Sequence, residues 1–224
     1  WKERVYKYEE YELESGDEIT AWLHGVDAKH DGFEFTLAYQ PIDLLRVDVA
    51  GSMGNWTHSD DASGEIRFRS LNPLHGDAAD TSYTVNYYIK DLPTGGAPQT
   101  QYVLGLSAFP VEGLKMQLLV KMNSNYYSTF NPFSRTNQND TATSWKIPDY
   151  TVMDLHAAYE LPLGFGGIKP SLFFHMFNMT NETYILQAVD NSKYNAWDKD
   201  HDADDAEVFF GLPLRWNAGI SLNF

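Results

Sequence analysis

Residues 217–224 read Asn217-Ala218-Gly219-Ile220-Ser221-Leu222-Asn223-Phe224, and apolar side chains alternate with polar or small ones along them. Counting back from the aromatic end, positions 224, 222, 220, 218 and 216 are apolar, whereas Asn, Ser or Gly occupies the positions between them. Successive side chains of a β-strand point to opposite faces. The stretch therefore predicts a strand with one apolar and one polar face, which fits a wall between lipid and water.

Six further segments alternate in the same way. They cover residues 33–39, 45–53, 102–109, 114–123, 150–161 and 168–178. The fourth segment places its apolar residues on one face and mostly polar ones on the other; the apolar set is Leu114, Met116, Leu118, Val120 and Met122. We expect residues 1–28, and 19–26 above all, to extend the first strand or to supply an eighth. The sequence thus predicts an all-β fold.

The connections between the expected strands are alternately short and long. Long ones span about 57–99, 131–148 and the residues before the last strand, and residues 83–89 are expected to extend a hairpin beyond the main sheet. Outer-membrane barrels combine short periplasmic turns with long extracellular loops. Aromatic residues lie near both kinds of strand end: Tyr39, Phe109, Tyr159 and Phe224 at short turns, and Trp56, Tyr126, Tyr127 and Tyr150 at long loops. Membrane proteins carry aromatic residues in the same way at the two membrane interfaces. We therefore expect an antiparallel transmembrane β-barrel with its C-terminus on the periplasmic side.

The composition narrows the class of protein. No apolar run is long enough for a membrane-spanning helix, although aromatic residues make up 15% of the chain. The net charge of −15 argues against nucleic acid as a partner, and the absence of cysteine excludes disulfides and Cys-based metal sites. Because Trp1 opens the chain without an initiator Met, we expect a processed product or a fragment.

Two resemblances sharpen this expectation. Asn217, Gly219, Leu222 and Phe224 stand where the β-signal read by the bacterial barrel-assembly machinery has its defining residues. Other short segments resemble sequence motifs of TonB-dependent outer-membrane receptors and transporters, and several have the form found in Bacteroidota. These segments are Gly32-Phe33-Glu34-Phe35 with Pro41, Gly54-Asn55-Trp56, residues 88–92 with 97–99, residues 145–150, Asn178-Met179-Thr180-Asn181 with Tyr184, and Gly211-Leu212-Pro213. Met179 and Thr180 replace the Leu and Phe of the family's Asn-Leu-Phe-Asn box. Arg215 lies one residue after the position that Arg occupies in the family's Gly-x-Pro-Arg element.

The resemblance implies a barrel of about 22 strands filled by an N-terminal plug. Residues 1–224 would be the C-terminal portion of that barrel, with seven or eight of its strands and without the plug and the TonB box. It also implies residence in the bacterial cell outer membrane, contact with lipid and lipopolysaccharide, and energy coupling to TonB–ExbB–ExbD through the absent N-terminal part. The cargo would be a scarce nutrient: a siderophore or other metal chelate, cobalamin, or a glycan.

The run Asp198–Glu207 contains six carboxylates in ten residues. Alternating carboxylates can bind Ca²⁺, but Ala203 and Phe209 replace the Gly and the bidentate Glu that an EF-hand requires. We therefore interpret the run as a solvated loop and expect no cofactor.

The remaining polar residues indicate no catalytic site. No two histidines have helical zinc-site spacing, and there is neither a Gly-x-Ser-x-Gly elbow nor a phosphate-binding Gly-rich loop. His156 and His175 fall on neighbouring expected strands and could face each other across the lumen, although a polar lumen wall explains them equally well. We expect no enzyme.

Ligand contacts, if the loops make them, would come from Trp145, Tyr194 and Trp197, because aromatic rings offer large contact area at small entropic cost. The same rings could instead pack their own loops. Two other classes of protein stay open: a standalone eight-stranded outer-membrane barrel with an adhesive or structural role, and a secreted soluble β-sandwich that binds carbohydrate.

Overall fold

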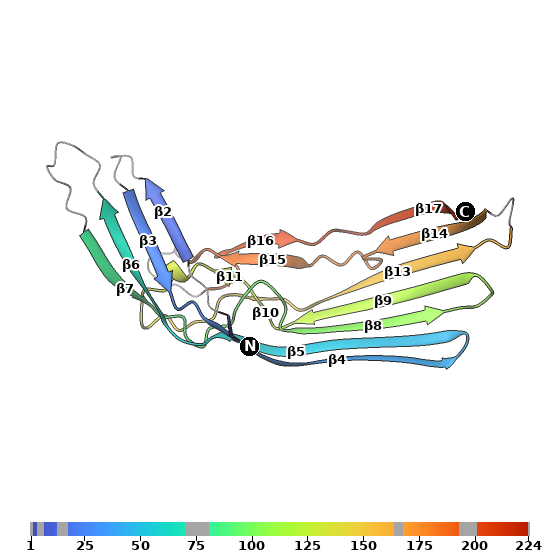
Figure 1. The fold of residues 1–224 in the computed structure, drawn as a ribbon, viewed down its shortest axis with the longest axis horizontal. Coiled ribbons are helices and arrows are strands. Elements are labelled where there is room, and N and C mark those ends of the chain that lie inside the picture. Colours follow the sequence, from blue (N-terminus) through green and yellow to red (C-terminus); the bar gives the residue numbers. More distant parts are fainter. Residues whose placement is uncertain are drawn as a thin grey trace.

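The computed structural model describes residues 2–3, 7–12, 18–69, 81–163, 168–192 and 201–223. These residues form β-strands and one 3-10 turn at Pro132–Ser134 (Figure 1). None of their helical segments is long and apolar enough to cross a membrane. Eight of the described strands form a long sheet in which every neighbouring pair is antiparallel. In spatial order they are β1 (Lys2–Glu3), β4 (Ala28–Ile42), β5 (Leu45–His58), β8 (Thr100–Ala108), β9 (Leu114–Ser124), β13 (Tyr150–Glu160), β14 (Lys169–Phe177) and β17 (Arg215–Asn223).

Three smaller sheets lie at one end of the large sheet, which we call the loop end; the short connections lie at the opposite, turn end (Figure 1). The first contains β2 (Lys7–Glu12), β3 (Glu18–His24), β6 (Ala62–Arg69) and β7 (Thr81–Tyr87). The second joins β11 (Thr129–Phe130), β15 (Ile185–Asp190) and β16 (Ala206–Phe210), with β11 parallel to β15. The third pairs β10 (Tyr126–Tyr127) with β12 (Lys146–Ile147).

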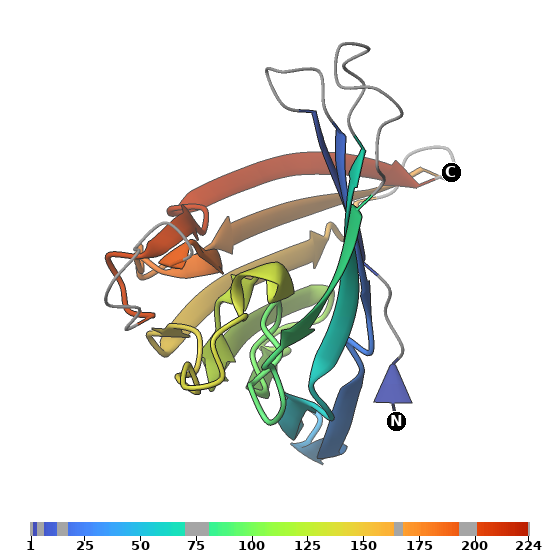
Figure 2. The same cartoon turned by 90° about the vertical axis from the view of Figure 1, so that its left-hand side faces the viewer.

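The expected strands are confirmed, with one difference in how the segments are placed. Residues 19–26 neither extend the first strand nor join the large sheet, because β3 pairs with β2 and β6 instead. The hairpin expected at residues 83–89 exists as β6–β7, which pairs Ala62 with Tyr87. The large sheet follows an arc from β4 to β17 (Figure 2), and no described strand joins its two edges. The all-β antiparallel expectation holds, whereas closure into a barrel is not seen among the described pairings.

The register across the large sheet sorts its side chains into apolar and polar rows. One row crosses seven strands and is apolar throughout: Tyr39, Val47, Leu106, Leu118, Leu155, Met176 and Trp216. The next row, on the opposite face, is polar throughout: Arg46, Ser107, Gln117, His156, His175 and Asn217. We call these faces the outer face and the inner face. A one-residue slip between any two strands would mix the rows, so side-chain polarity and backbone pairing specify the same register.

The outer face is apolar and uncovered in the described structure. Tyr39, Trp216 and Ile220 are 68%, 65% and 68% exposed, and Phe33, Leu37 and Leu222 on the same face are exposed as well. Soluble monomers rarely expose contiguous apolar patches larger than a few hundred Å². A whole sheet face of this kind instead suits contact with hydrocarbon chains.

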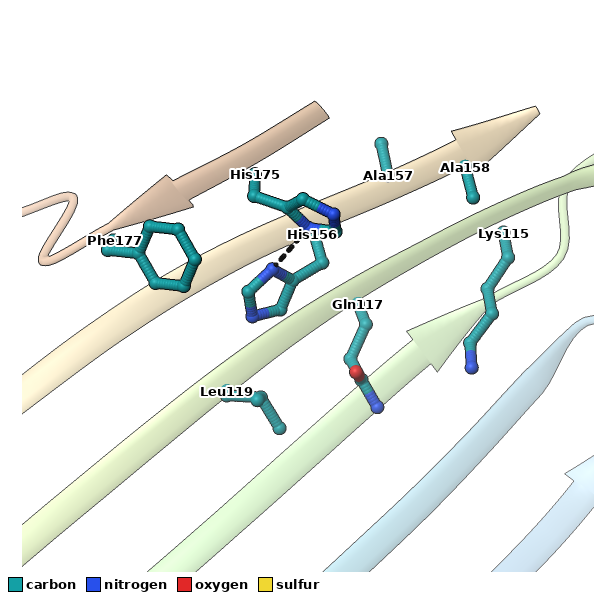
Figure 3. A pocket seen from close by; sticks show the side chains of 8 residues that line it. All are labelled: Lys115, Gln117, Leu119, His156, Ala157, Ala158, His175 and Phe177. Carbon is teal, nitrogen blue, oxygen red and sulfur yellow. Dashed lines mark hydrogen bonds between the residues drawn. The ribbon is translucent and has the colours of Figure 1, made fainter. Parts of the chain in front are cut away.

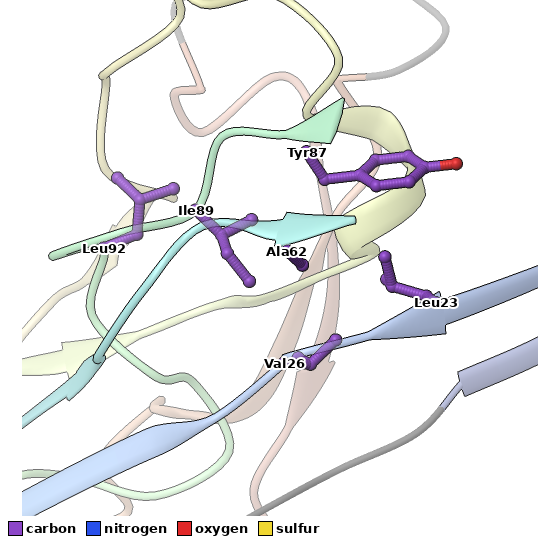
Figure 4. Close-up of a cluster of buried hydrophobic side chains, with 6 residues drawn as sticks. All are labelled: Leu23, Val26, Ala62, Tyr87, Ile89 and Leu92. Atoms are coloured by element: carbon purple, nitrogen blue, oxygen red, sulfur yellow. The ribbon is translucent and has the colours of Figure 1, made fainter. Parts of the chain in front are cut away.

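The compact hydrophobic core lies at the loop end and not against the large sheet. It is built from residues of β3, β6, β7 and the segment that follows β7 (Figure 4); they are Leu23, Val26, Ala62, Tyr87, Ile89 and Leu92. The Asp61 carboxylate accepts hydrogen bonds from the backbone N–H groups of Ile89 and Lys90 at 3.0 and 2.9 Å. The small sheet is thus packed like part of a soluble protein, whereas the large sheet has its apolar side outward.

Candidate functional site

The inner face carries a groove formed by β9, β13, β14 and β17. Two neighbouring cavities of about 420 and 360 Å³ share Phe177 in their lining. The first lies along the middle of these strands (Figure 3), and the second extends toward the loop end. Alternation puts polar side chains on this face of each strand, so that the groove offers hydrogen-bonding groups along its length.

His156 and His175 occupy the first cavity. They are direct cross-strand partners on β13 and β14, and their Nδ1 atoms lie 2.8 Å apart. Gln117 stands opposite His156 on β9 and donates from its amide to the Ser107 hydroxyl at 3.2 Å. The two histidines lie on neighbouring strands, as expected, but they contact each other on one wall and do not face each other across a lumen.

A buried carboxylate borders the second cavity. Asp154 accepts a hydrogen bond from the Lys121 ammonium at 2.7 Å and another from the backbone N–H of Asn178 at 2.9 Å. The Arg215 guanidinium lies over the ring of Phe177, 5.0 Å from its centroid. This part of the groove therefore combines two partnered cations with apolar side chains, among them Val152, Leu212 and Pro213.

Asn178 fastens the loop end of the groove. Its backbone has a φ of +52°, a left-handed conformation that Asn tolerates better than most residues. Its side-chain amide donates to the carbonyls of Glu182 and Leu212 at 2.9 and 3.1 Å, and its side-chain oxygen accepts from the Glu182 N–H at 2.8 Å. Nearby, Asn181 accepts from the N–H of Leu214 at 3.0 Å. The two phrases that resemble family motifs, at residues 178–184 and 211–213, are therefore in direct contact.

We expect Asn178→Ala to destabilise this corner by about 1–3 kcal/mol, because it removes three partly buried hydrogen bonds to the backbone of residues 182 and 212. Asn178→Gly keeps the left-handed backbone but removes the same hydrogen bonds, so it separates the two contributions. Hydrogen exchange of residues 178–186 in the folded protein measures the effect. Equal protection in wild type and Asn178→Ala would contradict the assignment.

The residues of the β-signal resemblance lie on β17. Asn217 faces inward opposite His175, and Leu222 points outward and is exposed. Gly219 faces Phe173, whose ring lies where a Cβ on residue 219 would stand. Phe224 falls outside the described residues. The alternation expected for this strand is confirmed, and its role in assembly stays a prediction.

A buried charged cluster in the loops was not anticipated from the sequence. It consists of Arg135, Asp140, Asp190 and His201, which come from three separate segments. Arg135 is 0% exposed; it lies 3.1 Å from an Asp140 oxygen, 3.7 Å from an Asp190 oxygen, and donates to the Ala142 carbonyl at 2.8 Å. Burial lowers the pKa of the Arg135 guanidinium, and the two carboxylates oppose that shift. The cluster fastens residues 135–142 to β15 and to residue 201.

His201 bridges the two carboxylates of this cluster. Its Nδ1 lies 2.6 Å from an Asp190 oxygen, and its Nε2 lies 3.0 Å from an Asp140 oxygen. Both ring nitrogens can donate only in the imidazolium form. The ring thus joins Asp140 to Asp190 within the buried cluster.

The acidic run is only partly the solvated loop that was expected. Residues 198–200 lie outside the described residues, but His201 and Asp205 are buried, so the solvated interpretation is wrong for these two. Carboxylate oxygens of Asp202, Asp204 and Asp205 lie within 4.8 Å of one another, and the Asp204 N–H donates to Asp202 at 3.0 Å. Acidic groupings of this kind are common on loops without an ion, and Ca²⁺ binding is not inferred from it.

Of the three aromatic residues expected to contact a ligand, only Trp145 is described. It is half-buried and packs against the small hydrophobic cluster of Tyr126, Ile147 and Ala188. Tyr194 and Trp197 lie outside the described residues. The described ring thus contributes to packing of its own loop, and ligand contact by all three stays a prediction.

Comparison with known proteins agrees with a sheet whose outer face is apolar and whose inner face carries a polar row. A family model described as "TonB dependent receptor-like, beta-barrel" matches residues 23–179, which is more than half of the chain. No curated protein matches the chain. The chain therefore belongs to the family of TonB-dependent receptor-like β-barrels, which are non-enzymatic transport proteins of the bacterial outer membrane.

Proposed function

We propose that residues 1–224 are the C-terminal portion of the barrel of a TonB-energised importer of a scarce nutrient. The observation that carries this proposal is the pair of adjacent rows across the large sheet, one entirely apolar and one entirely polar. Such a sheet separates hydrocarbon from an aqueous interior. The groove on the inner face then lies along the route that a solute takes through the barrel.

The two edges of the sheet support a wider barrel. One edge of β17 pairs with no described strand. At the edge of β4 that points away from β5, only Ala28 and Lys29 are paired, with β1. Backbone N–H and C=O groups in hydrocarbon must be hydrogen-bonded, so further strands are needed on both sides. In a family barrel of about 22 strands, the rest of the wall and an N-terminal plug meet these edges and the inner face.

In this proposal, nutrient binds at the loop end, the extracellular side, where aromatic residues including Trp145, Tyr194 and Trp197 meet it. TonB–ExbB–ExbD then acts on the plug, and the cargo passes along the inner groove to the periplasm, where β17 ends. The β-signal residues of β17 direct insertion by the barrel-assembly machinery. Siderophores and other metal chelates, cobalamin and glycans are the cargo classes we propose to test.

Deletion of the coding sequence tests the proposal in the native organism. We expect a growth defect on one limiting source among chelated iron, cobalamin and glycan, and the same defect when TonB is depleted in the wild-type strain. Reintroduction of the deleted coding sequence should restore growth only while TonB is present. Normal growth on all three sources, together with loss of surface attachment, would favour the standalone adhesive barrel instead.

A further inference from the structure

The transport proposal gives no specific role to the two imidazoles in the groove. The His156 and His175 rings lie side by side in the first cavity (Figure 3), with 2.8 Å between their Nδ1 atoms. At least one ring must be neutral at this distance, because two imidazolium rings would place two N–H donors against each other. The pair therefore presents lone-pair nitrogen at a fixed place on the inner wall.

We propose that the His156–His175 pair binds a late first-row divalent cation, with Cu²⁺ or Ni²⁺ preferred over Zn²⁺. Metal–nitrogen bonds of about 2.0–2.1 Å to two atoms 2.8 Å apart enclose an angle of about 85–90°. This is the angle between neighbouring ligands in square-planar and octahedral geometry, which Cu²⁺ and Ni²⁺ adopt with nitrogen and oxygen ligands. A tetrahedral zinc site needs the two nitrogens about 3.4 Å apart.

Packing around the rings holds this arrangement. His175 stacks on Phe173, with 5.5 Å between ring centroids and 30° between the ring planes. His156 meets the ring of Phe177 edge-on, with centroids 5.5 Å apart. Aromatic neighbours on both sides restrict the imidazoles, and chelation requires each ring to turn its Nδ1 lone pair from the other ring toward a common ion. A chelating pair that is already ordered loses less conformational entropy on binding.

The charges and ligand atoms near the pair favour a nitrogen-seeking cation over Ca²⁺ or Mg²⁺. Among the described residues that line this cavity, none is a carboxylate. The nearest one along β13 is Asp154, which is already bonded to Lys121 and to the Asn178 N–H. Gln117 provides an amide beside His156, whereas Lys115 lies at the other end of the cavity (Figure 3). Water, or the cargo's own ligand atoms, completes the coordination of the bound ion.

Binding by the pair follows from its geometry alone. Only the additional step, in which the bound ion or its chelate is cargo in transit along the groove, rests on the proposed function. A cation held by two side chains and by exchangeable ligands can be released, as transport requires. The pair would thus be a contact of the cargo with the barrel wall.

Titration of the complete transporter that contains residues 1–224, folded in detergent and purified without a histidine tag, tests the inference. We expect one Cu²⁺ or Ni²⁺ per chain by calorimetry at neutral pH, and coupling of bound Cu²⁺ to two nitrogens by electron paramagnetic resonance. His156→Asn and His175→Asn each remove a direct ligand and should weaken binding by at least about tenfold. His24→Asn, in strand β3 of the separate small sheet, is the matched control and should leave the affinity unchanged.

Circular dichroism and the mobility shift of unheated samples on gels establish that each variant is folded. Equal cation affinity of the wild type and the His156→Asn/His175→Asn double variant would overturn the inference, and so would an equal loss of affinity in His24→Asn. The pair would then be a polar contact of the wall. Growth of the deletion strain is measured separately from cation affinity. If the deletion strain shows no import defect although the protein binds the cation, the transport proposal has failed. If import is lost in the deletion strain but the protein binds no cation, the inference about the histidine pair has failed.

Discussion

Replacing Arg135 by alanine is expected to lower the stability of the loop end by about 3–5 kcal/mol, because it removes the guanidinium beside two buried carboxylates. Asp140 and Asp190 would then lose the guanidinium and keep the His201 ring within hydrogen-bonding distance, while both carboxylates stay buried. Native-state hydrogen exchange of residues 126–147 and 185–206 measures the local opening free energy directly. We expect both segments to lose protection together, since the charged cluster joins them.

Two variants show whether burial causes the effect. Arg46→Ala removes an arginine that also faces an aspartate, Asp48 at 2.7 Å, but this pair is exposed to solvent and its loss should change stability far less. Arg135→Lys keeps the charge, yet one ammonium cannot reproduce the planar fork whose two terminal nitrogens lie near Asp140 and Asp190, so it should restore only part of the loss. Unchanged exchange in Arg135→Ala would show that the cluster does not fasten the loops.

The second large effect concerns the outer face of the sheet. Leu118 lies near the middle of β9 in the apolar row, between Leu106 and Leu155. Leu118→Arg places a charge among acyl chains and should cost about 2–4 kcal/mol of folding free energy if this row is near the bilayer midplane. Denaturant titration of the protein folded into lipid vesicles, followed by tryptophan fluorescence, measures the difference.

The matched control is the neighbouring residue on the same strand. Gln117→Arg introduces the same side chain on the inner face, where water and polar groups solvate it, and should change stability far less. Equal destabilisation by the two substitutions would show that both faces meet the same medium. That result would remove the basis for treating this sheet as a membrane wall.

The fold class could be read from the sequence because the deciding signal is local. In β9, Leu118 and Val120 alternate with Gln117 and Lys121 every second residue, and that period defines both the strand and its two faces. The same argument placed His156 and His175 on one wall, since each occupies a polar-face position of its own strand. Residues 19–26 show the limit of this reasoning, because their alternation predicts a strand but not the sheet that it joins.

The charged cluster could not be found in this way. Arg135 and His201 are 66 residues apart, and His201 and Asp140 are 61 residues apart. Each lies in an irregular segment where no period relates one side chain to another. His201 also stands within an acidic run whose composition indicates solvent exposure. Nothing short of the folded loops shows that it is buried between Asp140 and Asp190.

The alternating pattern by itself determined the strands, their apolar and polar faces, and the side of the sheet on which the groove lies, because period-two alternation needs only neighbouring residues. Tertiary structure decided the rest: the 2.8 Å contact of His156 with His175, the fastening of the loops by Arg135, and the junction of Asn178 with Leu212. These depend on strand register and loop path, where residues far apart in the chain come within hydrogen-bonding distance.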